Sequence, residues 1–447
     1  MRHAGSRRRG VFKGVQSGNR SIRGLAGWHA GRVAVFFPGS DTTGTMRAPE
    51  ADYARSAAQR PIAMTVHSVL SALPAIYFIA ACGYVILAIG SVAHRRWRTI
   101  VPARQLPGIT VLKPVYGLDE GLYENLRSFC EQDYPVYQVV FALADGDDPA
   151  RPIIERLIAD LPGRDLALVV NDRLIGSNRK IANVANAFER AKHEVLVIAD
   201  SDMRVTSEYL RAVGAAFERP AVGAATCLYR GTPTRDLPSA FGALFMNEWF
   251  LPSVLVALRF QPLNFCFGAT MAIRREILTK IGGFERLAIE LADDYMLGKL
   301  VSDLHHEVAL VPYVVENVVA EAGFKELFRH ELRWARTVRA VQPLGYTMSF
   351  LTYVTPAALA VALTTASPTT AFAVLGTAVG LRMMMHDVAR LILGSNGPAV
   401  YGLVVLRDLL CFVVWAVSFC GRDVRWRGHD FTVSRDGHLE SKETMSR

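Results

Sequence analysis

The chain has 447 residues and a formal net charge of +9, a length that suits two or three structural units, or one domain plus membrane segments. Residues 1–63 hold eleven Arg and Lys against three acids, so the other 384 residues are almost neutral. A folded part without a basic excess argues against a nucleic-acid partner. The six cysteines form no C-x-x-C pair and imply neither a disulfide framework nor a zinc site.

The N-terminal stretch changes character near residue 64. Residues 1–63 are rich in Gly, Arg and Ser without sustained periodicity, which predicts a disordered basic extension. Residues 68–93 then contain no charge over 26 positions. As a helix they would span about 39 Å, more than the roughly 30 Å of a hydrocarbon layer. We predict a transmembrane anchor over 64–98; a buried soluble helix is the alternative.

A basic cluster directly follows this anchor, which predicts that the next part of the chain is cytoplasmic. The same orientation would force the eleven positive charges of residues 1–63 across the membrane. A translation start near Met64 would remove this conflict.

Residues 107–340 have the pattern of an α/β domain. Apolar runs rich in Val and Ile suit buried strands, and they alternate with helical patterns, which favours a parallel sheet. The predicted strands cover 108–115, 136–145, 166–171 and 194–200. The predicted helices cover 122–132, 149–161, 179–192 and 207–218.

Polar residues follow these strands, where ligands of such sheets bind. Asp200-Ser201-Asp202 ends the fourth apolar run. Buried carboxylates are costly unless paired, whereas Mg²⁺ or Mn²⁺ takes one or two carboxylates plus phosphate oxygens. Asp200 and Asp202 are therefore predicted metal ligands, with Asp200 also close to a bound diphosphate. Capping of the next helix is the alternative, although Thr206 or Ser207 suits that role better.

Two further clusters are candidates for nucleotide binding. Asp145-Gly146-Asp147-Asp148 follows the second strand, and a carboxylate there can accept the imide N–H of a uracil. Helix capping by Asp148 explains only one of these acids. Lys180 lies in the first turn of a helix, where cations oppose the helix dipole but suit a bound anion.

A second acidic pair, Asp293-Asp294, opens a predicted helix. One acid can cap that helix, and the other can take the proton from an acceptor hydroxyl. Arg333-Trp334 lies on an amphipathic helix from about 324 to 340. This pair is either an interfacial anchor or a guanidinium near the diphosphate beside an aromatic wall of the sugar site.

The C-terminal part is predicted to return to the membrane over 341–421. Residues 340–381 contain no charge, with a possible turn at Ser367-Pro368. Residues 399–420 are apolar except for Arg407 and Asp408, which should pair or face protein. Whether two or three crossings follow the domain stays open, and 422–447 is predicted to be a cytoplasmic tail. The apolar segment 236–260 is predicted to lie at the interface or in the domain core.

Taken in order, these clusters resemble the ceramide glucosyltransferase family and its bacterial relatives. The resemblance runs from about Ile109 to Phe431, and the matching motifs are V-L-K-P-V-Y-G, D-G-D-D-P-A, N-x-K-I-x-N, A-D-S-D-M-R-V, A-D-D-Y-M-L-G-K, H-E-L-R-W and W-R-G-x-x-F. The sequences of these motifs look most like those of the bacterial hopanoid-biosynthesis glycosyltransferases. The last family motif usually begins with Gln or Arg, and His330 stands there instead.

The resemblance implies an α/β GT-A (Rossmann-like) domain with N- and C-terminal transmembrane helices, in a bacterial inner membrane and with a cytoplasmic catalytic domain. It implies an inverting transfer of N-acetylglucosamine from a UDP-sugar donor to a hydroxyl of a bacteriohopanepolyol in the bilayer. In this scheme Asp148 touches the nucleotide, Asp200 and Asp202 hold metal and diphosphate, and Asp294 is the general base. Glucosylation of ceramide from UDP-glucose is the alternative, and a non-catalytic nucleotide-binding membrane subunit is a second one.

Overall fold

The computed structural model describes residues 49–94, 105–234, 236–394, 400–426, 429–434 and 438–441. The chain divides into two compact units, 1–62 and 63–447, and the second contains all the features below except the first part of α1. Helix α1 covers Pro49–His94, so the structure differs from the disorder predicted over 49–63. This stretch is rich in Ala, which favours helix, and α1 continues from it into the apolar anchor.

An eight-stranded mixed sheet forms the centre of the described domain, in the order β3-β2-β1-β4-β7-β6-β8-β5. The first four strands in this order are mutually parallel, as the alternation of strands and helices predicts. Strand β7 is antiparallel to β4 and β6, and β5 is antiparallel to β8. The strands are β1 Ile109–Pro114, β2 Tyr137–Leu143, β3 Leu166–Val170, β4 Val195–Ile198, β5 Met203–Arg204, β6 Val222–Pro233, β7 Met271–Arg274 and β8 Glu307–Val319.

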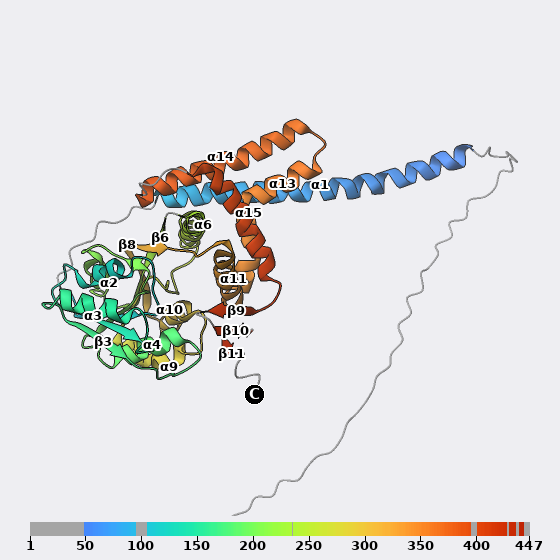
Figure 1. The fold of residues 1–447 in the computed structure, drawn as a ribbon. Coiled ribbons are helices and arrows are strands. Elements are labelled where there is room, and N and C mark those ends of the chain that lie inside the picture. The colour runs from blue at the N-terminus through green and yellow to red at the C-terminus, as the bar shows by residue number, and fades with distance from the viewer. Residues whose placement is uncertain are drawn as a thin grey trace, which may run out of the picture. The chain divides into compact units, whose positions relative to one another are not determined.

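Helices cover both faces of this sheet (Figure 1). Alternate residues of the parallel strands point to opposite faces: Val139 and Phe141 pack on one side of β2, Val140 on the other. The first face is covered by α2 Leu122–Cys130, α3 Arg151–Asp160 and α5 Tyr209–Ala216. The second is covered by α4 Arg179–Phe188, α8 Arg275–Lys280, α9 Gly283–Leu287 and α10 Asp293–Asp303. The predicted α/β class is confirmed.

The segment predicted to be interfacial or buried forms one interrupted helix. It consists of α6 Leu237–Phe245, the π-helical turn η1 Met246–Phe250 and α7 Leu251–Ala257. It packs against β6, with Leu251 and Val254 in a cluster shared with α1. Helix α11, Phe324–Val341, follows β8 and confirms the amphipathic helix predicted there.

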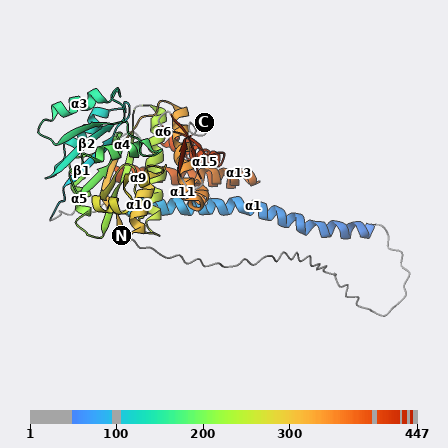
Figure 2. The same ribbon diagram turned by 90° about the horizontal axis from the view of Figure 1, so that it is seen from below.

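Apolar helices follow α11 in the chain. They are α12 Pro343–Met348, the 3₁₀ turn η2 Ser349–Thr352, α13 Val354–Thr364, α14 Pro368–Leu393 and α15 Tyr401–Ser418. Ser367 caps α14, so the turn predicted at Ser367-Pro368 is confirmed. From Ala72 on, α1 lies beside α13 and shares an apolar cluster with α7, α13 and α14 (Figure 1, Figure 2).

Three helical segments in the described residues are long and apolar enough to cross a membrane: Ala72–His94, Leu237–Ala257 and Tyr401–Ser418. A bent pair, Pro343–Thr352 with Val354–Thr364, would make a fourth if it counts as one span. The segment Leu237–Ala257 is two-thirds buried inside the protein, because it packs on the sheet domain.

The charges within 399–420 face protein, as predicted. Arg407 and Asp408 are fully buried. Arg407 pairs with Glu331 of α11 at 2.7 Å, and Asp408 pairs with Arg382 of α14. Asp408 also accepts a hydrogen bond from the Trp249 indole at 3.1 Å.

The C-terminal residues form more than a tail. Strands β9 Asp423–Trp426, β10 His429–Val433 and β11 Leu439–Ser441 make a small antiparallel sheet. Val424, Phe431 and Val433 pack with Leu291 of the loop before α10. The apolar positions alternate along these strands, which is the pattern of a sheet with one buried face.

Candidate active site

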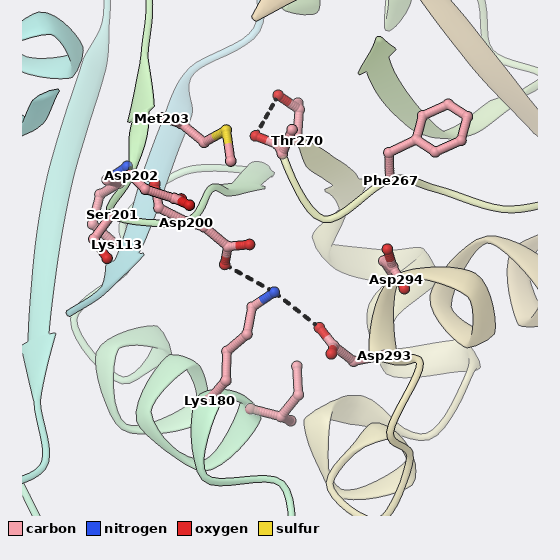
Figure 3. Close-up of polar contacts among 12 residues, drawn as sticks. Lys113, Lys180, Asp200, Ser201, Asp202, Met203, Phe267, Thr270, Asp293 and Asp294 are labelled. Atoms are coloured by element: carbon pink, nitrogen blue, oxygen red, sulfur yellow. Dashed lines mark hydrogen bonds and ion pairs between the residues drawn. The ribbon is translucent and has the colours of Figure 1, made fainter. Parts of the chain in front are cut away.

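The acids predicted after β4 lie in a tight turn between β4 and β5. The ammonium of Lys113, in β1, donates to the Asp200 carbonyl at 2.5 Å. The Ser201 hydroxyl donates to the Asp119 carboxylate, also at 2.5 Å. These contacts fix the backbone of the turn and leave the Asp200 carboxylate directed into the site (Figure 3).

The carboxylate of Asp202 has an incomplete set of partners. Asn317 of β8 donates to its Oδ2 at 2.9 Å. Its Oδ1 is buried and has no hydrogen-bond partner in the described part of the chain. Burial, followed by the charges of Asp200 and Asp119, raises the pKa of Asp202 to about 7. A buried carboxylate with an orphaned oxygen beside a second carboxylate is a site that a cation would stabilise.

Lys180 joins the two acidic pairs that the sequence singles out. Its Nζ lies 3.0 Å from Asp200 Oδ1 and 3.2 Å from Asp293 Oδ2 (Figure 3). Burial lowers the pKa of Lys180, but the carboxylates of Asp200, Asp293 and Asp294 outweigh this and hold it above its ordinary value. The ammonium therefore stays charged, and it links the end of β4 to the start of α10.

Asn178 explains why Lys180 points into this gap. Its side-chain oxygen caps α4 by accepting from Ile181 N at 3.1 Å. Its Nδ2 donates to the Glu290 carbonyl at 2.8 Å and to Asp293 Oδ1 at 3.3 Å. The cap thus ties the first turn of α4, with Lys180, to the loop that carries the second acidic pair.

Asp294 faces the same space from α10 (Figure 3). Burial, followed by the charge of Asp293, raises the pKa of Asp294 to about 6, although Lys180 opposes the shift. The gap between the acidic pairs is bordered by Gly268: a β-carbon there would lie 3.4 Å from Asp200 Oδ2 and 3.5 Å from Asp294 Oδ2. A bare backbone therefore borders the space between these two carboxylates.

Asp145 and Asp148, at the end of β2, have different surroundings. Asp148 is buried and accepts from Gly117 N at 3.1 and 3.0 Å and from Ala150 N at 2.9 Å. Gly117 has a φ of +68°, which favours glycine. Asp148 thus holds the loop after β1 in place. Asp145 is exposed and accepts from Asp147 N at 2.9 Å, so its second oxygen faces solvent.

Arg333 and Trp334 lie on α11 rather than in the cluster around Lys180. Trp334 stacks on Phe245 of α6, with ring centroids 5.9 Å apart, and its ring centroid lies 4.2 Å from that of His330. His330 Nδ1 lies 2.9 Å from Glu321 Oε1. Arg333 lines a cavity of about 280 Å³ between α11 and β9. The structure thus brings Lys180, Asp200, Asp202, Asp293 and Asp294 together and places Arg333 and Trp334 on a separate helix.

Sequence reasoning missed several residues of the site. Gly268 and Asn317 lie in segments that carry no charged motif. Lys113 had a usable signal: a lysine inside the apolar strand I-T-V-L-K-P must have a partner. It is fully buried, lies 3.8 Å from the centre of the Phe129 ring, and has a pKa lowered to about 8 by burial against the opposing Asp200 charge.

The sheet is half parallel and is covered by helices on both faces. One acidic pair follows β4 and the other opens α10. These features define a GT-A type α/β protein. The profile of glycosyl transferase family 21 matches residues 75–439, and the chain belongs to this family of sugar-transferring enzymes.

The chain is similar to two named relatives. "Ceramide glucosyltransferase 3" of Caenorhabditis elegans is 23% identical over 261 residues, 58% of this chain and 56% of the relative. "Ceramide glucosyltransferase" of Candida albicans is 33% identical over 116 residues, 23% of this chain and 21% of the relative. The chain thus spans about half the length, or less, of these relatives, and both are eukaryotic proteins.

Among solved structures, the chain is similar to the mannosyltransferase PcManGT from Pyrobaculum calidifontis in complex with GDP-Man and Mn²⁺. The TM-score is 0.49 and the identity 20%, over 79% of this chain and 98% of the other. TarS of S. aureus in complex with UDP-GlcNAc gives a TM-score of 0.34 at 14% identity, over 75% of this chain and 99% of the other.

Proposed function

We propose that this chain is an inverting glycosyltransferase that moves a sugar from a UDP-sugar donor onto a hydroxyl of a membrane lipid. The observation that supports this most is the pair of acidic groups facing one space: Asp200 with Asp202 on one side and Asp294 on the other. Gly268 borders that space with backbone alone. A nucleotide-binding subunit without catalysis would have no use for a carboxylate opposite the diphosphate site.

The residues at the end of β4 fit a divalent metal. The orphaned Oδ1 of Asp202 and the raised pKa of this carboxyl are both relieved by a cation. Mg²⁺ and Mn²⁺ are commonly held by one or two carboxylates together with substrate phosphate oxygens. Asp200 and Asp202 would hold the ion, which supplies positive charge that makes the UDP diphosphate a better leaving group.

Asp294 is the proposed general base. A carboxyl with a pKa of about 6 is mostly ionised at neutral pH and basic enough to remove the proton of an acceptor hydroxyl. The freed oxygen attacks the anomeric carbon from the side opposite UDP, so the configuration inverts in one displacement. Asp293 and Lys180 position this base: Asp293 pairs with Lys180, and Lys180 pairs with Asp200.

The remaining predicted donor contacts lie around this centre. Asp145, with an oxygen facing solvent at the end of β2, is the better candidate for the uracil imide N–H, and Asp148 holds the loop beneath it. Arg333 would reach the diphosphate from α11, and Trp334 would form a wall of the sugar and acceptor site. The stacked Phe245 supports Trp334 from the other side.

The apolar helices give the domain access to a lipid acceptor. Large apolar side chains are exposed on α1, α13 and α14, among them Ile79, Leu363 and Phe372, and extended exposed apolar surface marks membrane contact. We propose an anchor over 64–98 and membrane segments over 341–421 that flank a catalytic domain at 107–340. The basic cluster after the anchor favours a cytoplasmic catalytic domain. The resemblance of the motifs to bacterial relatives is the ground for proposing the inner membrane of a bacterium.

Two substrate pairs are proposed for this reaction. The motif wording favours N-acetylglucosamine and a bacteriohopanepolyol. The similarity to proteins named ceramide glucosyltransferase favours glucose and ceramide. Both share the UDP portion, so the acidic clusters do not separate them.

The test uses the full chain purified in detergent, with UDP-N-acetylglucosamine or UDP-glucose and each lipid. UDP release and the mass of the glycolipid are measured together. We expect one pair to give a glycolipid with an inverted linkage, and we expect chelator or Asp202→Asn to abolish turnover. Equal turnover in excess chelator would contradict the metal, and UDP release that no lipid stimulates would contradict the lipid acceptor.

A further inference from the structure

A cavity rich in arginine lies between α11 and β9, away from the acidic centre. Its volume is about 280 Å³. On α11, Arg329, Arg333 and Arg336 recur at a spacing that places them on one helix face. Arg425 adds a fourth guanidinium from β9, and Asp423 is the single acid among the lining residues; the others are Leu332 and Val424.

Hydrogen bonds to backbone carbonyls fix the walls of this cavity. Arg336 donates to the carbonyls of Asp423 and Cys420, and Arg339 donates to carbonyls of the same turn. These bonds hold β9 and the end of α15 against α11. The Nε of Arg336 is buried and has no hydrogen-bond partner in the described chain. One N–H group of a residue that lines the cavity is therefore left without a partner among the described residues.

The position of the cavity selects a membrane ligand. Helix α15 is a candidate membrane span that ends at Ser418, and Arg336 binds the carbonyl of Cys420, two residues later. The arginines thus lie beside the end of a candidate membrane span. Basic pockets at such places bind anionic lipid headgroups.

The chemistry of the cavity selects a phosphate. Guanidinium groups match the geometry of phosphate oxygens and bind them through paired hydrogen bonds. Arg333 is already proposed for the donor diphosphate. The other three arginines, Arg329, Arg336 and Arg425, against one aspartate repel an amine and leave a neutral headgroup without charge complementarity. Arg329 also pairs with Glu326 at 3.5 Å, but this contact is exposed and weak.

We propose that the cavity between α11 and β9 binds the phosphate of an anionic phospholipid and thereby seats α11 at the membrane surface. This inference rests on the proposed membrane location and not on the proposed reaction. Since α11 also carries Trp334 and Glu331, a bound phospholipid would steady the helix that borders the acceptor site.

The first test measures lipid binding without catalysis. The full chain in neutral detergent is titrated with phosphatidylglycerol or phosphatidylcholine, and retained lipid is counted by native mass spectrometry. Arg329→Gln with Arg425→Gln removes two guanidiniums of the cavity and keeps Arg336 and Arg339, which bind carbonyls at the end of α15. Each of the two substitutions should weaken phosphatidylglycerol binding about fivefold, the usual effect of one basic residue near an anionic headgroup. Arg156→Gln, at an exposed arginine of α3, is the matched control.

The outcomes separate cleanly. Selective retention of phosphatidylglycerol, lost in the double variant and kept in the control, supports the proposal. Equal retention of both lipids, or equal retention by wild type and double variant, overturns it.

A second measurement distinguishes the lipid phosphate from the donor diphosphate. In phosphatidylcholine vesicles, added phosphatidylglycerol should raise the turnover of the wild type and not that of the double variant, with the KM for the UDP-sugar unchanged. A higher KM for the donor with unaltered phosphatidylglycerol activation would assign the cavity to the donor and overturn the proposal. Absence of turnover with every donor would contradict the proposed function, while the binding experiment would still decide the lipid site.

Discussion

The raised pKa of Asp294 gives the proposed base a distinct pH signature. Burial and the neighbouring Asp293 charge raise the pKa of this carboxyl to about 6, so the base is ionised above that pH and protonated below it. Activity that needs the ionised form should therefore fall as the pH drops through about 6. A carboxylate with an ordinary pKa would instead lose its function near pH 4.

The expected size of the loss follows from the titration of one group. One pH unit below its pKa, about a tenth of a carboxyl is ionised, so kcat/KM should fall about tenfold per unit below pH 6. The assay is kcat/KM for the donor at saturating lipid and metal, because excess metal compensates for protonation of Asp202. The quantity kcat/KM reports groups of the enzyme before it binds the donor.

The substitution Asp294→Asn should lower kcat by roughly 10²–10⁴-fold and abolish the acid limb near pH 6. UDP binding should remain, and thermal stability should not fall, because the amide removes a half-buried charge. Asp303→Asn, at the other end of α10 where Asp303 pairs with Lys299 at 2.6 Å, is the control. A wild-type profile that stays flat between about pH 5 and 7, or an Asn variant with near-normal turnover, would refute the assignment of Asp294.

Three further substitutions test other parts of the site. Gly268→Ala should leave the melting temperature almost unchanged, because the new β-carbon would stand at ordinary contact distances. The KM for the donor should nevertheless rise several-fold. An unchanged KM would mean that the donor sugar lies elsewhere. Lys180→Met should destabilise the fold by about 3–5 kcal/mol, since Asp200 and Asp293 lose their shared cation. Mn²⁺ should then raise the melting temperature of this variant more than that of the wild type. Equal metal responses would contradict the idea that Lys180 and the metal both neutralise Asp200. Arg407→Met should likewise destabilise the fold by about 3–5 kcal/mol, because Glu331 is left buried and unpaired. Adding Glu331→Gln should restore part of this stability in thermal unfolding experiments. Purely additive losses would contradict a paired interaction.

The strands and helices of the first half of the domain were predictable from periodicity. Val136–Asp145 and Glu194–Asp200 are short apolar runs that end in acids, and β2 and β4 occupy them. Adjacent parallel strands end at the same edge of a sheet, which is why motifs far apart in the chain meet. The meeting of Lys180 with Asp200 and Asp293, however, depends on how α4 and α10 pack, and no sequence period contains that information.

The sequence did not predict the uncharged residues of the site or the strands at the C-terminal end. Gly268 matters only because a side chain is absent, which a single sequence does not reveal. The strands after Arg422 were predicted to be a tail, since three short strands near a basic terminus give a weak alternation. Their apolar face is buried only through Leu291 of a distant loop, so the signal for folding was tertiary.

The contacts of α11 explain why charged residues persist inside the apolar helices. Trp334 stacks on α6, Glu331 pairs with the buried Arg407 of α15, and Arg336 binds the backbone after α15. A buried ion pair is costly to break, because separating the partners leaves uncompensated charges inside the protein. A loose apolar contact would let α11 slide against α15. The charged contact instead fixes the helix that borders the proposed acceptor site relative to the proposed membrane segments, and so relative to a lipid acceptor that approaches Asp294.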